Sequence, residues 1–77
     1  MAIGFVLIRA APNYEREVYY KLCRIKGIAE LHPIFGEYDF IVKIEVEDFD
    51  KLANIVVKKI RTILGVVDTK TLTRTKF

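Results

Sequence analysis

The hydrophobic pattern opens with a run of β-favouring residues at positions 3–10, Ile-Gly-Phe-Val-Leu-Ile-Arg-Ala. Both alternating sets of positions in this run are apolar, which is typical of a strand buried on both faces. Two further stretches, 28–35 and 38–46, also have the composition of strands. The core face of the second of these stretches consists of Phe40, Val42, Ile44 and Val46. We therefore expect a central first strand and a third strand with one face in the core.

Two segments have the spacing of amphipathic helices. Pro12 and Asn13 end the first strand, and Asn13 is the expected amino-terminal cap of a helix that ends at Gly27. The second helix is expected to begin after the cap residue Asp48 and to end at Gly65. Its apolar stripe follows the 3.6-residue period of an α-helix and contains Phe49, Leu52, Ala53, Val56, Ile60, Ile63 and Leu64.

Proline, glycine and threonine positions complete the order of the strands. Pro33 has no backbone N–H to donate, so the second strand is expected at an edge of the sheet. Gly36 and Glu37 are expected to form a tight turn. The stretch 66–75 is the expected last strand, and one of its sides carries Thr69, Thr71, Thr73 and Thr75.

Together these elements give the order βαββαβ. Right-handed crossovers then predict an α+β, ferredoxin-like sandwich with a four-stranded antiparallel sheet in the order 4-1-3-2 and both helices on one face. The first strand is apolar on its other face as well. We therefore expect a second copy of the chain to cover that open face, which makes the protein a homodimer.

The composition limits the organisation of the chain. Seventy-seven residues support one core, so we expect a single domain over residues 1–77 and no separate DNA-binding domain. The hydrophobic share of 52% favours self-association. The single cysteine, Cys23, excludes an internal disulfide, and a cytoplasmic protein is expected. No signal peptide or membrane span is apparent, and the 13 basic and 10 acidic residues are interspersed.

The residues that most enzymes use are missing. The chain has no serine for a serine nucleophile, and its one histidine, His32, has no second histidine with which to hold a metal. The four glycines are isolated, so no phosphate-binding loop is present. Acylphosphatases share this fold and use a glycine-containing loop with an arginine, but residues 10–13 are Ala-Ala-Pro-Asn. We expect no catalysis, no cofactor and no metal.

Two motifs resemble the ligand-sensing (RAM) domain of leucine-responsive and asparagine-type (Lrp/AsnC) regulators. The first is Gly-Glu-Tyr-Asp-Phe-Ile-Val at 36–42, and the second is Leu-Gly-Val-Val-Asp-Thr-Lys-Thr at 64–71. In that family a Gly-x-Tyr-Asp-aromatic turn joins two strands, and the last strand opens with Gly-Val-x-x-Thr-x-Thr. The resemblance extends over essentially all 77 residues.

The resemblance implies a stand-alone sensor that works through assembly. In this family open sheet faces stack into a dimer, and dimers commonly assemble into a ring such as an octamer. A free amino acid would bind in clefts between subunits and modulate transcription through full-length Lrp/AsnC-type regulators. Those regulators read DNA with an amino-terminal helix-turn-helix, so no direct DNA binding is expected of this chain.

A cleft for a free amino acid has defined chemical needs. Its ammonium group requires an anion and its carboxylate requires hydrogen-bond donors. Asp39 is the candidate anion, the turn amides at 36–38 are the candidate donors, and two threonine hydroxyls of the last strand would complete the hydrogen bonds. The candidate ligand-binding residues are therefore Gly36, Glu37, Tyr38, Asp39, Thr69 and Thr71.

The same residues also fit purely structural roles. Gly36 fits a hairpin, Asp39 can stabilise a turn, and the threonines are β-branched residues that suit a strand. A module that only oligomerises and binds nothing therefore remains an alternative.

Single-stranded RNA binding is a second alternative. Ferredoxin-like sheets with exposed aromatic residues bind RNA, and the segment 36–40 together with Phe5 is superficially similar to their aromatic signature. Two features count against this function. Phe40 belongs to the face expected under the helices, and the two acidic residues of the segment would repel phosphate.

Overall fold

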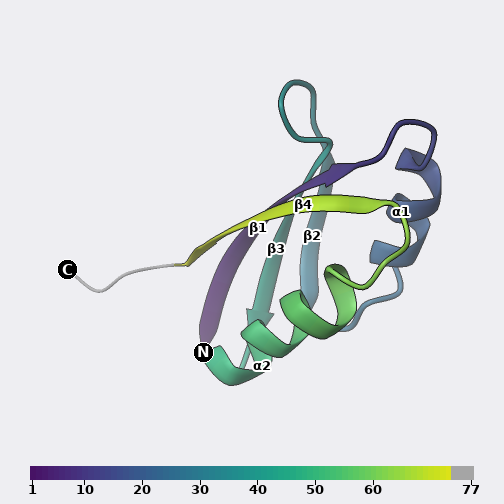
Figure 1. Cartoon of the computed structure of the whole chain (residues 1–77). Coiled ribbons are helices and arrows are strands. Elements are labelled where there is room, and N and C mark those ends of the chain that lie inside the picture. The colour runs from purple at the N-terminus through teal and green to yellow at the C-terminus, as the bar shows by residue number, and fades with distance from the viewer. Residues whose placement is uncertain (74–77) are drawn as a thin grey trace.

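The computed structural model describes residues 1–73 as one sheet and a set of helical segments (Figure 1). The strands form an antiparallel sheet in the order β2-β3-β1-β4. This arrangement confirms the predicted ferredoxin-like topology with the order 4-1-3-2 and a central first strand. The elements are β1 (Ala2–Ala10), α1 (Glu15–Leu22), β2 (Ile28–Pro33), β3 (Phe40–Val46), α2 (Phe49–Asn54), the π-helix η1 (Ile55–Ile60) and β4 (Val66–Thr73).

One face of the sheet packs against the helices. Val18 and Leu22 from α1 and Ile60 from η1 have no exposed surface and join one core cluster with the strands. The strand residues of that cluster alternate along the chain, as the geometry of a strand requires. They are Ala2, Val6, Ile8, Ala10, Phe40, Val42 and Ile44.

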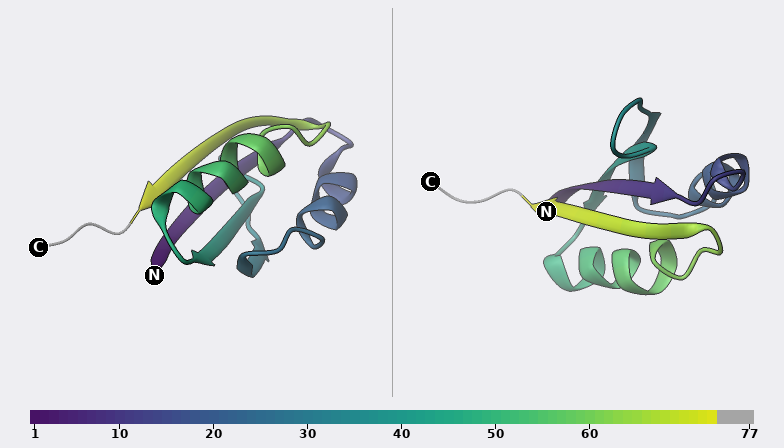
Figure 2. Two further views of the ribbon diagram at one scale, coloured as in Figure 1. Left: turned by 90° about the horizontal axis from the view of Figure 1, so that it is seen from below. Right: turned by 45° about the horizontal axis from the view of Figure 1, so that its top comes forward.

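The opposite face of the sheet lies away from α2 and η1 (Figure 2). On β1, Ile3, Phe5 and Leu7 point to this face, because they alternate with the core residues. Phe5 is 41% exposed, and its partner on β4, Leu72, is 49% exposed. The prediction that β1 is apolar on both faces is therefore correct, and the helices of the chain cover one of them.

The first helix differs from its predicted form at both ends. Asn13 has a left-handed backbone, with φ of 73°, and Tyr14 occupies the cap position without a side-chain hydrogen bond. The predicted capping by Asn13 is wrong, because this short polar residue adopts the left-handed turn conformation that asparagine tolerates. The helix ends at Leu22, and Gly27, with φ of 100°, lies in the turn before β2.

The second helix begins as predicted and then changes its winding. Asp48 caps α2, because its Oδ1 accepts a hydrogen bond of 2.9 Å from the backbone N–H of Lys51. η1 is a π-helix, whose hydrogen bonds join residues five apart, so Ile55 and Ile60 share the buried face. The predicted apolar stripe, which assumed the period of an α-helix throughout, does not include Ile55. Three members of that predicted stripe are exposed: Phe49, Ala53 and Leu64.

The sheet edges agree with the prediction. Pro33 is the last residue of β2, which lies at one edge of the sheet. Helical winding stops at Ile60, and a turn in which Gly65 has φ of 102° leads into β4 at the other edge. Arg74 and Thr75, which the prediction included in the last strand, lie outside the described residues.

The connection between β2 and β3 is longer than the tight turn predicted at Gly36 and Glu37. It spans residues 34–39, which we call the 34–39 loop. Gly36 has φ of 129°, a conformation that favours glycine. β3 consequently begins at Phe40 and not at Tyr38, so Tyr38 belongs to the loop.

Candidate functional site

The 34–39 loop rises from the side of the sheet opposite to α2 and η1, beside the end of β1 (Figure 2). Its two ends are joined by a hydrogen bond of 2.9 Å from the backbone N–H of Ile34 to the carbonyl of Asp39. The N–H of Asp39 donates in turn to the carbonyl of Ile8, also at 2.9 Å. The loop is therefore tied to the central strand of the sheet.

Asp39 has a structural partner within its own chain. Its Oδ2 accepts a hydrogen bond of 2.8 Å from the backbone N–H of Ala10, and the side chain is half-buried. Within residues 1–73, Oδ1 accepts no hydrogen bond. One carboxylate oxygen thus supports the loop, and the other has no hydrogen-bond donor among the described residues.

Arg9 braces the loop from β1, and the sequence reasoning missed it. Its Nε donates to the carbonyl of Glu37 at 3.0 Å, and Nη2 lies 3.4 Å from Oε1 of the same residue. Its guanidinium carbon is 5.1 Å from the ring centroid of Tyr38, within the range of a cation–π contact. The available signal was that Arg9 is the one charged residue in the apolar stretch 3–10.

The backbone of the loop can receive an anion. Among the described residues, no acceptor takes a hydrogen bond from the amides of Gly36, Glu37 and Tyr38. A Cβ placed on Gly36 would meet nothing within 4 Å, so the space above it is open. Successive backbone N–H groups in such a turn form a concavity suited to a carboxylate. The three predicted donors therefore lie in one loop and have no acceptor in the described part of the chain.

Thr69 and Thr71 lie on the other side of the sheet. They pair with Ile8 and Val6 of β1, and both of these residues point into the helical core. Directly paired residues project to the same face of a sheet, so the two threonines project to the helix side of β4. In one chain the sheet therefore separates the threonines from the 34–39 loop, which projects from the open side.

Two cavities lie along β4 on this helix side. A polar cavity of about 200 Å³ is lined by Arg61 and by residues 66–69. A second cavity, of about 360 Å³, lies between β4 and the second helical segment, and we call it the β4 groove. The β4 groove is lined by Phe49, Leu52, Ala53, Val56, Val57, Arg61, Thr71 and Thr73. Arg61 borders both cavities.

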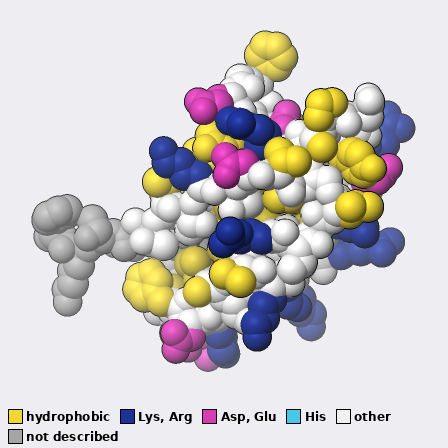
Figure 3. Space-filling model, in the orientation of Figure 1, with side chains coloured by type: hydrophobic (Ala, Val, Ile, Leu, Met, Phe, Trp, Pro, Cys, Tyr) yellow, Lys and Arg dark blue, Asp and Glu magenta, His cyan; other side chains and the backbone are white. Residues whose placement is uncertain are grey.

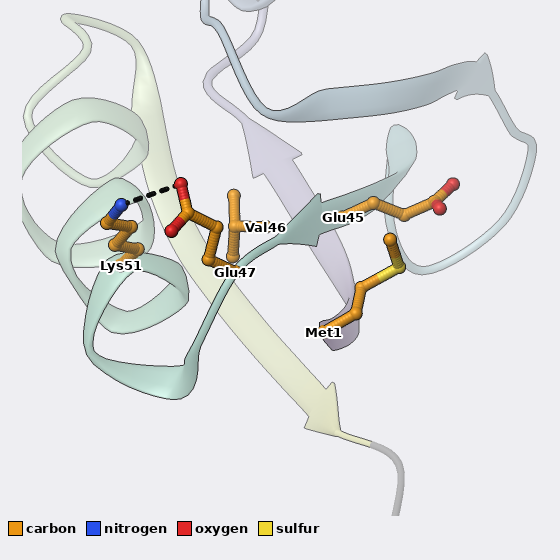
Figure 4. Close-up of a pocket in the computed structure, with 5 residues that line it drawn as sticks. All are labelled: Met1, Glu45, Val46, Glu47 and Lys51. Carbon is orange, nitrogen blue, oxygen red and sulfur yellow. Dashed lines mark ion pairs between the residues drawn. The ribbon is translucent and has the colours of Figure 1, made fainter.

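A third cavity, of about 510 Å³, lies where β3 ends and α2 begins (Figure 4). Its charged groups partly satisfy each other, because Lys51 Nζ is 3.0 Å from Oε1 of Glu47. This contact raises the pKa of Lys51 above its usual value. Met1, Glu45 and Val46 complete the lining, so the cavity contains none of the predicted ligand-binding residues.

The aromatic residues considered for RNA binding lie on opposite faces of the sheet. Phe5 points to the open face, whereas Phe40 is buried under the helices and is 4% exposed. They cannot form one stacking platform, which counts against the RNA alternative.

Neither a metal site nor a membrane-spanning helix is found in the part of the chain that the structure describes. Within residues 1–73, no three histidine, cysteine, aspartate or glutamate side chains gather where they could hold a metal ion. No helix in the same range is long and apolar enough to cross a membrane.

Comparison with known sequences finds a family model and several related proteins that match most of the chain. The model of the Lrp/AsnC ligand binding domain family matches residues 3–76. An uncharacterized HTH-type transcriptional regulator of Pyrococcus horikoshii is 37% identical over 72 residues, which cover 90% of this chain and 48% of the regulator. A homocitrate synthase of Sulfolobus acidocaldarius is 36% identical over 70 residues, which cover 90% of this chain and 15% of the enzyme. The chain thus spans about half the length of the curated regulator.

Solved structures share the fold. The crystal structure of FFRP-DM1 has a TM-score of 0.91 and 33% identity, and the match covers 97% of this chain and 100% of that chain. The transcriptional regulator NMB0573 from Neisseria meningitidis, crystallised as a complex with L-Met, has a TM-score of 0.84 and 16% identity. That match covers 97% of this chain and 50% of the regulator, and at this identity the likeness shows the fold alone.

Proposed function

This chain belongs to the Lrp/AsnC ligand-binding domain family, since the family model matches it over residues 3–76, and we propose that it is an amino-acid-responsive regulatory domain. It binds a free amino acid where two copies meet and acts on transcription through assembly with Lrp/AsnC-type regulators. The whole-length family match is the observation that carries this proposal. The matching segment of homocitrate synthase is 15% of that enzyme, which fits a regulatory module better than a catalytic one.

The loop chemistry supports an amino acid as the ligand. The amides of Gly36, Glu37 and Tyr38 donate to no acceptor among the described residues, and they can receive the carboxylate. Asp39 keeps one oxygen for the ammonium group while the other holds Ala10. A structural relative with the same fold was crystallised with L-Met, which is an amino acid of the proposed class.

Assembly is the second part of the proposal. A second copy covers the open face, on which Phe5 of β1 and Leu72 of β4 are exposed to solvent. Such a homodimer, and the larger ring expected from the family, also supply the subunit boundary that the ligand needs. The cytoplasmic location and the single-domain organisation remain predictions of the sequence.

Thermal melting with each of the common amino acids tests the proposal. A ligand at about 100 times its Kd adds about 2.7 kcal/mol to the free energy of unfolding. In a domain of this size that corresponds to a rise in Tm of roughly 10 °C or more. We expect such a rise for one or a few amino acids. A flat response to all of them would favour the module that only oligomerises.

Asp39→Asn tests the proposed ammonium partner. The amide oxygen of asparagine can still accept the hydrogen bond from the Ala10 N–H, so the loop keeps its support while the charge is removed. We expect the Tm without ligand to change little and the response to the amino acid to be lost. Glu17→Gln, on the exposed side of α1, is the matched control. A response that survives in Asp39→Asn would remove Asp39 from the site.

A further inference from the structure

The tip of the 34–39 loop presents an aromatic side chain to solvent. Phe35 is fully exposed, more than any other large hydrophobic residue that the structure describes. Hydrophobic atoms stand out over this loop in the space-filling view (Figure 3). The loop is held in place at two points: Nε of Arg9 donates to the carbonyl of Glu37 at 3.0 Å, and Oδ2 of Asp39 accepts from the N–H of Ala10 at 2.8 Å. The chain thus fixes a large apolar group in water, where such a group is unfavourable unless it meets a partner.

The β4 groove offers an apolar surface of suitable size. Phe49 and Val57 line its walls and are 56% and 51% exposed. Its volume of about 360 Å³ exceeds the cavity of about 150 Å³ that holds benzene in an engineered core. The volume of the groove is therefore large enough for a phenyl ring.

Charge also matches between the loop and the groove. Arg61 borders the groove and forms no ion pair or side-chain hydrogen bond with any residue in the range 1–73. The loop carries Glu37 two positions after Phe35, and its side chain is 77% exposed although Oε1 lies 3.4 Å from Nη2 of Arg9. An arginine beside an incoming aromatic ring and carboxylate gains both a cation–π contact and an ion pair.

A loop cannot reach the groove of its own chain. The 34–39 loop projects from one side of the sheet, and the β4 groove lies beside α2 and η1 on the other side (Figure 2). We propose that Phe35 of one copy docks into the β4 groove of a second copy. Its ring lies against Val57 and Phe49, and Arg61 faces the loop.

This docking would also unite the two halves of the predicted ligand site. Residues 36–39 arrive with the loop of one copy, and Thr71 lines the groove of the other. Arg61 of the groove then becomes a further donor for the carboxylate of the ligand. In this respect the inference rests on the proposed function, but the contact itself forms without an amino acid.

Engineered disulfides test the contact directly. Cys23→Ser removes the native thiol, and Ile34→Cys with Val57→Cys places one thiol on the loop beside the intact Phe35 and one in the groove. Under mild oxidation we expect covalent dimers or a ladder of larger species, because a disulfide forms only when the two Cα atoms come within about 7 Å. The matched control pairs Ile34→Cys with Tyr20→Cys, since Tyr20 is 59% exposed on α1 and lies outside the groove.

The outcomes separate the contact from the ligand hypothesis. Cross-linking above the control supports the docking, whether the product is a dimer or a ladder. Cross-linking no greater than the control, in a preparation that light scattering shows to be assembled, would overturn it, as would a chain that stays monomeric. A missing thermal response to amino acids would count against the proposed function and leave the cross-linking result unchanged.

Phe35→Ala gives a second measure without engineered thiols. Truncation of a central interface aromatic weakens association by roughly tenfold or more in Kd. We expect sedimentation to show this loss for Phe35→Ala and not for Tyr20→Ala. Because Phe35 is fully exposed, the variant should keep its fold, and circular dichroism checks this. An unchanged Kd for self-association would contradict the docking.

Discussion

The two faces of the sheet come from the same strands but are completed in different ways. On the helix side, Val6 and Ile8 have no exposed surface, and no polar side chain of the described residues is buried beside them. On the open side, Phe5 pairs with Lys43, and Leu7 pairs with Lys70, so charged residues alternate with apolar ones. The pattern of β1 identifies residues that avoid water on both faces, but it does not identify what covers each face.

The largest expected effect comes from substitutions on β1, which test the two faces of the sheet separately. Ile8→Ala opens a cavity in a fully buried site and should cost about 2–5 kcal/mol in the free energy of unfolding. Leu7→Ala, on the half-buried open side, should cost less in a dilute monomer but should weaken self-association. Urea unfolding at two protein concentrations measures both effects. A loss for Leu7→Ala that equals that for Ile8→Ala at low concentration would mean that the chain's own fold covers both faces.

Two glycines with positive φ extend the comparison. A Cβ on Gly65 would lie 2.7 Å from Cβ of Tyr14, so Gly65→Ala combines backbone strain of about 1–2 kcal/mol with overpacking of about 1–3 kcal/mol. A Cβ on Gly36 would meet nothing within 4 Å, so Gly36→Ala carries only the strain, about 1–2 kcal/mol. Thermal unfolding of the two variants should rank Gly65→Ala as the less stable. The reverse order would show that the 34–39 loop has a partner in the folded state that the single chain does not reveal.

Much of the fold could be predicted from local sequence. The strand order follows from element order and handedness, and Pro33 and Asp48 have the edge and cap roles that their chemistry requires. The winding of η1 could not be predicted, because an apolar stripe was drawn at one fixed period. Ile55 was missed for this reason. Asn13 was assigned by preference alone, and its backbone conformation depends on the turn into the helix.

The candidate site also has a part that local sequence predicts and a part that depends on the pairing of distant strands. Residues 36–39 are adjacent in sequence, so their proximity was predictable, but Tyr38 and Asp39 were expected in the third strand and lie in the loop instead. Whether Thr69 faces the loop depends on the register between β1 and β4, which local patterns do not determine. The brace from Arg9 spans 28 positions and follows from the pairing of β1 with β3. The family resemblance is confirmed by the match over residues 3–76, but it supplied neither the orientation of Thr69 nor the brace from Arg9.

A smaller effect concerns the amino-terminal end of α2, one of the helical segments that cover the sheet. Asp48→Ala removes the cap that binds the N–H of Lys51 and should cost about 0.5–2 kcal/mol in the free energy of unfolding. Asp50→Ala, in the first turn of the same helix, removes a charge without removing the cap and should cost less. Chemical unfolding of both variants provides the test. Equal losses in the free energy of unfolding would mean that the helix dipole, and not the cap, stabilises the amino-terminal end of α2.

The smallest expected effect concerns a group of exposed charged residues on the open face, which no helix of the chain covers. Nε2 of His32 donates to Oε1 of Glu30 at 3.0 Å, and Lys43 lies 3.6 Å from the other carboxylate oxygen. The hydrogen bond from His32, followed by the charge of Lys43, lowers the pKa of Glu30 below 4.5. The folded state therefore holds this proton less tightly than the unfolded state. The stabilisation is complete above pH 4.5 and is lost as the pH falls through the lowered pKa.

Titration of the Glu30 carboxyl carbon by NMR measures that pKa directly. His32→Ala removes the larger cause and should raise the pKa of Glu30 toward 4.5, whereas Lys43→Ala removes the second cause and should raise it less. Because the group is exposed, added salt should diminish the Lys43 effect and have less influence on the hydrogen bond. A larger change in Lys43→Ala than in His32→Ala would show that the charge of Lys43, and not the hydrogen bond from His32, is the main cause of the lowered pKa of Glu30.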